Sequence, residues 1–302
     1  MRILASDGIE KTAKANLEAM GHEVVEQFYE VDELNEQVKN FDVLVVRSAT
    51  KVRKPTIDAA VEGGRLKMII RGGVGIDNID HVYAEEKGIK VRNTPRASSD
   101  AVAELALAHM FSCARFVGIA NHTIREDRWE KKSYKGIELM GKTVGIIGYG
   151  RIGQALGRRC IALGMKVLAY DIYHVEGIEN ENMHYAEMDE VLAQSDFISV
   201  HTPAIDGKKL ICAENIAKMK DGVIIINTSR GNNLNEADLL AALESGKVAA
   251  AGLDVLDDEK NFTNSKALYM NDHVSITPHI GAQTKEAQKR IGAEIVELIK
   301  GM

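Results

Sequence analysis

The stretch that decides the fold is Thr143-Val144-Gly145-Ile146-Ile147-Gly148-Tyr149-Gly150-Arg151-Ile152-Gly153. Its apolar first half predicts a buried strand, and the G-x-G-x-x-G pattern that follows predicts a tight turn into a helix. Gly148 permits the turn, Gly150 lets a pyrophosphate approach the backbone, and Gly153 lets the helix pack closely on the strand. The N-terminus of that helix would offer free N–H groups and its positive dipole end to the phosphates. The stretch therefore predicts a dinucleotide-binding fold.

An acidic residue at the end of the next apolar run indicates which dinucleotide is bound. Asp171 follows Val167-Leu168-Ala169-Tyr170, where this fold carries the acid that binds the adenosine ribose hydroxyls. A carboxylate there repels the 2′-phosphate of NADP, and Ile172-Tyr173 offer no arginine to hold one. We therefore expect NAD as the cofactor.

Short apolar runs alternate with helical patterns along the whole chain, which is typical of parallel α/β folds. One set of strands is expected at 2–5, 23–27, 43–46, 68–71 and 90–92. A second set, of six strands, is expected at 144–147, 167–170, 197–200, 223–227, 249–253 and 274–277. A long helix is expected from Ser99 to about Arg125, and a final helix at 285–300 that returns to the first domain. We therefore predict an α/β protein with two doubly wound parallel-sheet domains.

The bulk composition excludes several classes of function. A net charge of −6 argues against general nucleic-acid binding, and no apolar stretch approaches the roughly 20 residues that cross a bilayer. The apolar N-terminal segment is too short for a signal peptide. The three cysteines are widely spaced and form no CxxC pair, so we expect free thiols in a reducing cytoplasm and no metal site.

Polar side chains follow three strands of the second set, where doubly wound folds bind their ligands. Arg230 follows one strand, Asp254 and Glu259 follow the next, and His279 follows the last. A histidine can take a hydroxyl proton, a carboxylate can orient it and stabilise its charged form, and a guanidinium can hold a substrate carboxylate. One histidine or arginine alone is more often a surface residue, but three groups behind strands of one sheet favour hydride transfer.

Several further motifs point to one family. They are 45–51 (VVRSATK), 73–80 (GVGIDNID), 93–95 (NTP), 148–153 (GYGRIG), 200–203 (VHTP), 227–231 (NTSRG) and 277–281 (TPHIG). With these motifs the chain resembles the D-isomer-specific 2-hydroxyacid dehydrogenases, and among them the D-3-phosphoglycerate dehydrogenases, over essentially its whole length. The resemblance implies a Rossmann NAD domain at 96–280, inserted into a flavodoxin-like substrate domain formed by 1–95 and 281–302, with a cleft between them.

The resemblance also implies roles for individual residues. Arg230, Glu259 and His279 match the catalytic arginine, glutamate and histidine. The positions that match cofactor contacts are Val74, Gly148, Gly150, Arg151, Ile152, Gly153, Asp171, Thr202, Thr228, Ser229, Asp254, Ile280, Gly281 and Ala282. Those that match substrate contacts are Arg47, Ser48, Val74 and Gly75, together with Arg230 and His279.

The expected reaction is the oxidation of D-3-phosphoglycerate to 3-phosphohydroxypyruvate with NAD, the first step of serine biosynthesis. Arg47 and Arg71, and a cluster of Lys131, Lys132 and Lys135 beside Trp129, are candidates to hold the phosphate. The alternatives are another 2-hydroxy acid, as in glyoxylate or hydroxypyruvate reductases and D-lactate-type enzymes, and a non-catalytic NAD-sensing scaffold resembling corepressors.

The resemblance further implies a homodimer that forms through residues 99–135. Since the chain ends at Met302, without the C-terminal regulatory modules of longer phosphoglycerate dehydrogenases, we expect no serine feedback through such a module. The chain departs from the family pattern at Lys260-Asn261, where a proline is usual, and at Asn235, where an acid is usual. We therefore expect the loop that carries Glu259 to differ from the family pattern.

Overall fold

The computed structural model describes residues 1–204 and 207–302. The chain divides into two compact units, one formed by Met1–Ser98 with Ala282–Met302 and the other by Ser99–Gly281. The second unit is thus inserted into the sequence of the first. Gly281 lies in the second unit, where its N–H donates to Asp254 Oδ2 at 2.8 Å. The divisions therefore fall at 98/99 and 281/282, not at the expected 95/96 and 280/281.

A parallel sheet forms the centre of the first unit. Within the described residues it has five strands, in the order β2-β1-β3-β4-β5. The strands are β1 Arg2–Ala5, β2 Glu23–Glu26, β3 Val43–Val46, β4 Met68–Arg71 and β5 Lys90–Asn93. This is the flavodoxin-like order that was predicted, and its ligand crevice lies beyond the carboxyl ends of β1 and β3.

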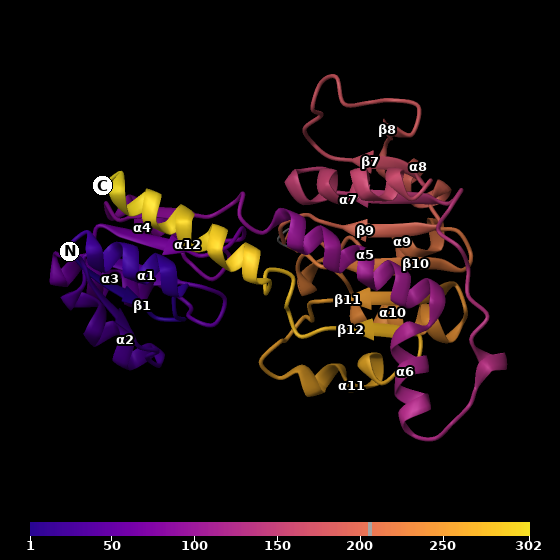
Figure 1. The fold of residues 1–302 in the computed structure, drawn as a ribbon, viewed down its shortest axis with the longest axis horizontal. Helices are drawn as coiled ribbons and strands as arrows, with labels where there is room; N and C mark the ends of the chain where they lie inside the picture. The colour runs from indigo at the N-terminus through magenta and orange to yellow at the C-terminus, as the bar shows by residue number, and fades with distance from the viewer. Residues whose placement is uncertain (205–206) are drawn as a thin grey trace. The chain divides into compact units, whose positions relative to one another are not determined.

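Helices cover both faces of this sheet. They are α1 Lys11–Ala19, α2 Val31–Gln37, α3 Lys54–Gly63, α4 His81–Glu86 and α12 Lys285–Lys300, with a 3₁₀ turn η1 at Val38–Asn40. The last helix returns to this unit as predicted, and Figure 1 shows both chain termini there. Ile291 and Ile295 of α12 share a buried apolar cluster with Leu17 of α1 and Ile3 of β1. This apolar contact holds the returning segment on the sheet.

The second unit is built on a longer parallel sheet. Over the part of the chain that is described, its order is β12-β11-β10-β9-β6-β7-β8. The strands are β6 Thr143–Ile147, β7 Lys166–Tyr170, β8 Met183–Tyr185, β9 Phe197–Val200, β10 Val223–Asn227, β11 Val248–Leu253 and β12 Val274–Ile276. The first six, taken from β8 to β11, follow the Rossmann strand order, and β12 extends that sheet. The prediction of six strands was wrong because it omitted β8, a strand of 3 residues.

The long helix predicted from Ser99 to about Arg125 is two helices. Helix α5 (Ser99–Arg115) and helix α6 (Val117–Arg125) are bent by 65°. The break is at Phe116, which has a left-handed φ of 57°. The Phe116 ring centroid lies 5.8 Å from that of Tyr134 and 6.0 Å from that of His273. Packing of this aromatic ring therefore accompanies the break, with no glycine or proline at that position.

The remaining helices surround the sheet of the second unit. They are α7 Arg151–Ala162, α8 Met188–Gln194, α9 Ala213–Lys218, α10 Glu236–Glu244 and α11 Lys266–Tyr269, with 3₁₀ turns η2 Lys131–Ser133, η3 Gly231–Asn233 and η4 Phe262–Ser265. Among the described residues no single helix has the length and apolar character to cross a membrane, although the bent pair α5 and α6 together does by length and composition. Much of α5 is buried in the fold.

Candidate active site

The glycine-rich turn joins strand β6 to helix α7. Gly148 has a left-handed φ of 92°, and a Cβ there would lie 2.8 Å from the backbone carbonyl of His201. A Cβ at Gly153 would collide with the carbonyl oxygen of Gly148, whereas the space around Gly150 is open. Gly150 is also the residue that precedes α7. The turn thus has the tight bend, the close helix packing and the exposed backbone that a pyrophosphate requires.

Asp171 lies directly after strand β7, on the same edge of the sheet. Its Oδ1 accepts a hydrogen bond from Tyr173 N at 3.0 Å, which fixes the turn beyond the strand. The two neighbouring side chains, Ile172 and Tyr173, are 77% and 78% exposed. A carboxylate in this place suits a ribose with two free hydroxyls and repels a ribose 2′-phosphate.

Arg230 lies on a loop that folds tightly after strand β10. Asn227 Oδ1 accepts hydrogen bonds from Ser229 N and Ser229 Oγ, and Asn227 Nδ2 donates to Arg230 O at 2.8 Å. Arg230 Nη1 donates to Ser229 O at 2.7 Å. The hydroxyl of Thr228 is buried and has no hydrogen-bond partner among the described residues. An orphaned hydroxyl at this strand end fits a bound ligand, because buried polar groups otherwise find partners.

Asn233 is a residue of this site that the sequence did not reveal. It is fully buried, and its Nδ2 donates to Thr202 O and Ser229 Oγ, both at 3.0 Å. Asn233 therefore ties the loop after β9 to the loop that carries Arg230. Because Asn232 and Asn235 are asparagines too, the sequence did not show which of them is buried.

Asp254 is buried at the end of strand β11, with 1% of its surface exposed. Its carboxylate accepts hydrogen bonds from the N–H groups of Ile280 and Gly281, each at 2.8 Å, and from Thr277 Oγ1 at 2.6 Å. The backbone oxygen of Asp254 accepts from His279 N at 2.8 Å. One carboxylate therefore fixes the loop that carries His279.

His279 and Glu259 form a hydrogen-bonded pair. His279 Nδ1 lies 2.9 Å from Glu259 Oε2, and the two side chains are 33% and 44% exposed. Since a carboxylate only accepts, Nδ1 carries the proton and Nε2 is the nitrogen left to receive one. The backbone of His279 has a left-handed φ of 53°, an unusual conformation for a residue with a side chain.

The loop between Asp254 and strand β12 is shaped by Glu236. Glu236 Oε1 accepts from Asp257 N at 2.9 Å, and its Oε2 accepts from the hydroxyl of Ser265. Asn235 caps helix α10 by accepting from Ala237 N at 3.1 Å. The acid that follows Asn235 thus supports the loop of Glu259, a role that sequence reasoning did not assign.

In the first unit, Arg47 and Ser48 lie just after strand β3. Asp7 Oδ2 accepts from Arg47 N at 2.6 Å and from Thr50 N at 3.1 Å. Asn78 Nδ2 donates to Arg47 O at 2.7 Å, so it joins this loop to the one that follows β4. The β4 loop contains Val74 and Gly75, and the Val74 side chain is 37% exposed. The predicted substrate positions of this unit therefore lie on neighbouring, cross-linked loops.

A cavity of about 330 Å³ opens at the carboxyl ends of β1 and β3. It is lined by Asp7, Glu10 and Arg47 on one side and by Ile291 and Ile295 of α12 on the other. Burial lowers the pKa of Arg47, and the nearby Asp7 carboxylate opposes that change. The cavity lies at the switch point of the flavodoxin-like sheet, where such folds bind ligands.

Comparison with known proteins decides the family. The model of the D-isomer specific 2-hydroxyacid dehydrogenase NAD binding domain matches residues 107–281. The chain belongs to the D-isomer-specific 2-hydroxyacid dehydrogenase family. This confirms the resemblance, the two-sheet α/β fold and NAD as the cofactor.

Three relatives illustrate the range of the family. The dehydrogenase is 47% identical to a hydroxypyruvate reductase of Thermotoga maritima, over 99% of this chain and 97% of that protein. It is 42% identical to a D-3-phosphoglycerate dehydrogenase of Methanocaldococcus jannaschii, over 99% of this chain but only 57% of that protein. The structure of D-lactate dehydrogenase from Aquifex aeolicus, complexed with NAD and lactic acid, superposes with a TM-score of 0.86 at 29% identity, covering 99% and 94% of the two chains.

The predicted positions of the dehydrogenase fall into both units. The second unit holds Arg230, Glu259 and His279, and it brings the last two into direct contact. It also holds most of the predicted cofactor positions, at the carboxyl ends of its strands. The first unit holds Arg47, Ser48, Val74, Gly75 and Ala282.

Proposed function

We propose that this dehydrogenase oxidises D-3-phosphoglycerate to 3-phosphohydroxypyruvate with NAD, the reaction that opens serine biosynthesis. The observation that carries the dehydrogenase chemistry is the hydrogen bond between His279 Nδ1 and Glu259 Oε2. It leaves Nε2 of an accessible histidine ready to receive a proton, as oxidation of a hydroxyl requires. When bound, NAD supplies the acceptor for the hydride.

The other residues of the site have complementary roles in this proposal. His279 takes the C2 hydroxyl proton, and Glu259 orients the imidazole and stabilises its charged form. Arg230 binds the substrate carboxylate through its planar guanidinium. Its loop is rigid because Asn227 and Asn233 hold it from within.

The cofactor positions in the proposal are those predicted from the sequence. Gly148, Gly150 and Gly153 admit the pyrophosphate, with Arg151 and Ile152 at the start of α7 beside it. Asp171 binds the ribose, and the hydroxyl of Thr228, which has no partner among the described residues, hydrogen-bonds the cofactor in this proposal. The other proposed contacts are Val74, Thr202, Ser229, Asp254, Ile280, Gly281 and Ala282.

A phosphorylated substrate is supported by cationic groups in the first unit. Arg47 lines the cavity beyond β1 and β3, and the guanidinium of Arg71 occupies the space that a Cβ at Gly73 would need. Guanidinium groups are the preferred partners of phosphate. The test is a steady-state panel of 2-hydroxy and 2-keto acids, in both directions, with NAD and NADP. A preference for D-3-phosphoglycerate or phosphohydroxypyruvate supports the assignment, and equal rates with unphosphorylated acids exclude it.

A hydroxypyruvate reductase is the second candidate. It is favoured by the identity of 47% to such an enzyme, across nearly the whole of both chains. The same panel separates the two, because hydroxypyruvate lacks the phosphate that Arg47 would bind. Glyoxylate and D-lactate belong in the panel as the smaller substrates of the alternative prediction.

A non-catalytic NAD-sensing scaffold is the alternative from another class. It predicts NAD binding without turnover of any acid. The variant His279→Ala distinguishes the two, since the catalytic proposal requires loss of turnover with NAD binding retained. Unchanged turnover in this variant would exclude the catalytic role of His279.

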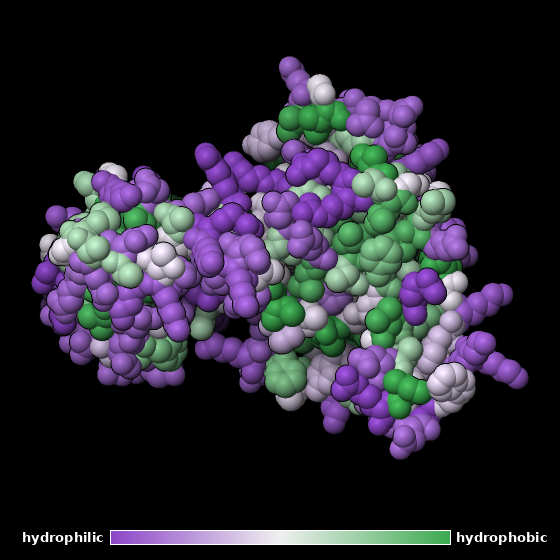
Figure 2. Space-filling model, in the orientation of Figure 1, coloured by the Kyte–Doolittle hydropathy of each residue, from purple (hydrophilic) through white to green (hydrophobic). Residues whose placement is uncertain are grey.

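We also propose that the chain forms a homodimer through residues 99–135. Exposed apolar side chains gather on this part of the second unit, as Figure 2 shows over α5 and α6. Val117 is 55% exposed, Ile124 47% and Trp129 81%. Apolar groups so exposed are typical of an interface, and a second copy of the chain is the occupant that we infer.

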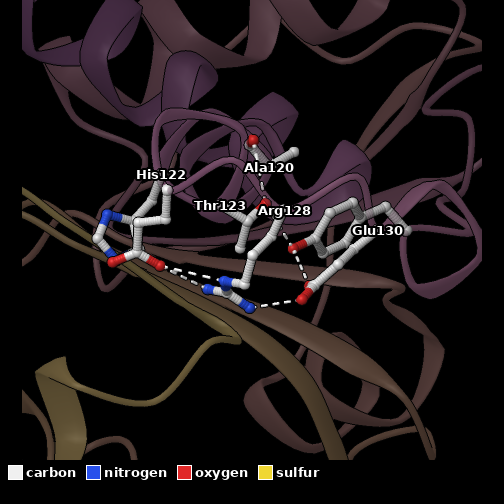
Figure 3. Close-up of polar contacts among 7 residues, drawn as sticks. Ala120, His122, Thr123, Arg128 and Glu130 are labelled. Atoms are coloured by element: carbon white, nitrogen blue, oxygen red, sulfur yellow. Dashed lines mark hydrogen bonds and ion pairs between the residues drawn. The ribbon is translucent and has the colours of Figure 1, made fainter.

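The segment around Trp129 is braced from within. Arg128 binds Glu126 at 2.8 Å and also pairs with Glu130, while Tyr134 Oη donates to Glu130 and bonds the hydroxyl of Thr123, both at 3.0 Å (Figure 3). These contacts fix the conformation of this segment, which we call the arm, while the side chain of Trp129 stays exposed. A pre-formed arm loses less conformational entropy when it binds a partner.

A reducing, cytoplasmic setting remains part of the proposal. Cys113, Cys160 and Cys212 are all free thiols. Burial raises the pKa of Cys113 and of Cys160 to about 12, so both remain protonated and unreactive.

A further inference from the structure

A buried histidine lies beneath the loop that carries His279. His109 is on helix α5 and is 2% exposed. Its Nδ1 lies 3.0 Å from Ser275 Oγ, and its Nε2 lies 3.0 Å from Thr277 Oγ1. A Cβ at Gly252 of strand β11 would lie 2.5 Å from the Cβ of His109, so the strand passes directly under this side chain. His109 is therefore fixed in place on two sides.

The direction of each hydrogen bond in this series follows from its last acceptor, the carboxylate of Asp254. Thr277 Oγ1 lies 2.6 Å from Asp254 Oδ1, and a carboxylate can only accept. Thr277 therefore donates its single proton to Asp254 and must accept one from His109 Nε2. Burial lowers the pKa of His109, so its ring is neutral and carries one N–H, although Asp254 opposes that effect. Nδ1 then accepts from the hydroxyl of Ser275.

The chain of bonds ends on the backbone beside His279. Asp254 accepts from the N–H groups of Ile280 and Gly281, and its own carbonyl accepts from His279 N. These bonds hold His279 in its left-handed backbone conformation, with φ 53°. A residue with a side chain keeps such a conformation only where its surroundings fix it.

We propose that His109 is a positioning residue for His279, acting through Thr277 and Asp254. Its N–H fixes the direction of the Thr277 hydroxyl, which then binds Oδ1 and holds the carboxylate in the orientation that receives both backbone amides. His109 touches neither the substrate nor the cofactor in this role. The proposal rests on the proposed role of His279 in proton transfer.

The first test compares matched variants of the buried helix. His109→Met keeps an apolar volume without the donor, and His109→Gln keeps an N–H at the position of Nε2. Met110→Leu is the control, because Met110 is the fully buried neighbour of His109 on the same helix and packs in the apolar core. We expect kcat to fall about tenfold in His109→Met, with KM for NAD within about twofold, and to recover in His109→Gln. An unchanged kcat in His109→Met, or an equal loss in Met110→Leu, would overturn the proposal.

A double-mutant cycle tests the hydrogen-bond relay from His109 through Thr277 to Asp254. Thr277→Val removes the hydroxyl and keeps the shape, so His109→Met should add no further loss of kcat in the Thr277→Val background. Losses that multiply would show that His109 acts by another route and would exclude the relay.

Backbone hydrogen exchange separates this proposal from the proposed function. In the absence of substrate, the amides of Ile280 and Gly281 should exchange faster in His109→Met than in the parent protein. In Met110→Leu they should exchange at the parent rate. If His279→Ala leaves turnover intact, the proposed function fails. The exchange rates of Ile280 and Gly281 then still show whether His109 acts through Thr277 and Asp254. Equal exchange in parent and His109→Met would refute the relay even if His279 is catalytic.

Discussion

The Nδ1 of His279 lies 2.9 Å from the Oε2 of Glu259, although the two residues belong to loops that follow different strands. The backbone of each loop is fixed by a carboxylate: Asp254 accepts from the two amides that follow His279, and Glu236 accepts from the amide of Asp257 in the loop of Glu259. The pair is thus positioned by the shared edge of the sheet and by two loops whose backbones are fixed by hydrogen bonds.

The first prediction concerns this pair. Glu259→Gln removes the charge that stabilises the protonated imidazole, and we expect kcat to fall about 100-fold while NAD affinity changes less than about twofold. Asp257→Asn is the control, because it neutralises a carboxylate of the same loop that pairs with Lys209. Steady-state kinetics with NADH titration measures both. Parent-like kcat in Glu259→Gln would refute the role of this glutamate.

The second prediction concerns the choice of cofactor. Asp171→Ala should weaken NADH binding about tenfold, because the ribose hydroxyls lose a charged hydrogen-bond acceptor. NADPH binding should stay almost unchanged, because for this nucleotide the lost hydrogen bond is offset by the removal of repulsion from the 2′-phosphate. Dissociation constants for both nucleotides, measured by calorimetry, test this. Asp189→Ala, on the exposed surface of α8, should change neither constant. An equal loss for both nucleotides would show that Asp171 supports the fold and does not select the cofactor.

The third prediction concerns pH and stability. Burial lowers the pKa of His201 from 6.5 to about 4, and its Nδ1 is buried without a hydrogen-bond partner in the described part of the chain. Since the unfolded chain binds this proton below pH 6.5 and the folded chain does not, stability is fully present above pH 6.5. It is lost as pH falls towards 4, by up to about 3 kcal/mol.

Urea denaturation at pH values from 7 to about 4 measures this effect. The variant His201→Asn should show a shallower fall in the free energy of unfolding than the parent chain. His109 contributes in the same direction, so part of the slope should remain. Identical slopes in the two proteins would exclude His201 as a source of acid sensitivity.

The fourth prediction concerns the dimer. Trp129→Asp places a charge on an apolar side chain that is 81% exposed, and we expect sedimentation velocity to show a shift from dimer to monomer. Val82→Asp, at a position 61% exposed on α4, should leave the dimer intact. Trp129 is the single tryptophan of the chain, so its emission should also move to shorter wavelength as protein concentration rises. A parent chain that sediments as a monomer would contradict the proposal.

Most of the fold could be predicted because its strands are apolar runs between turn signals. Strand β8 was missed because Met183-His184-Tyr185 shows too little alternation to reveal a period. The break at Phe116 was missed for a different reason. Gly118 weakens the helix locally, but one glycine inside a helical pattern does not locate a break, and the bend is associated with contacts to Tyr134 and His273, the latter distant in sequence.

Some residues of the candidate site could likewise be predicted from the sequence, and others could not. The places of Arg230, Glu259 and His279 could be predicted because each follows a strand of one sheet, and parallel strands bring their carboxyl ends to one edge. The choice of Glu259 over Asp257 and Asp258 came from the family resemblance. The supporting residues Asn233 and Glu236 could not, since their partners are set by how loops fold back on one another. His109 lies within an ordinary apolar helix pattern, where a single polar residue gives no indication of what it contacts.

The division of the chain at 98/99 and 281/282 has a consequence for how this protein can change. The residues proposed to handle protons are encoded in one continuous middle segment, whereas most of those proposed to recognise the acid's side group come from the flanking segments. An exchange of residues 1–98 and 282–302 with those of a family member would therefore alter substrate preference and leave the proton chemistry in place. On these proposed roles, replacement of the two ends of the gene is expected to be enough to give a new specificity.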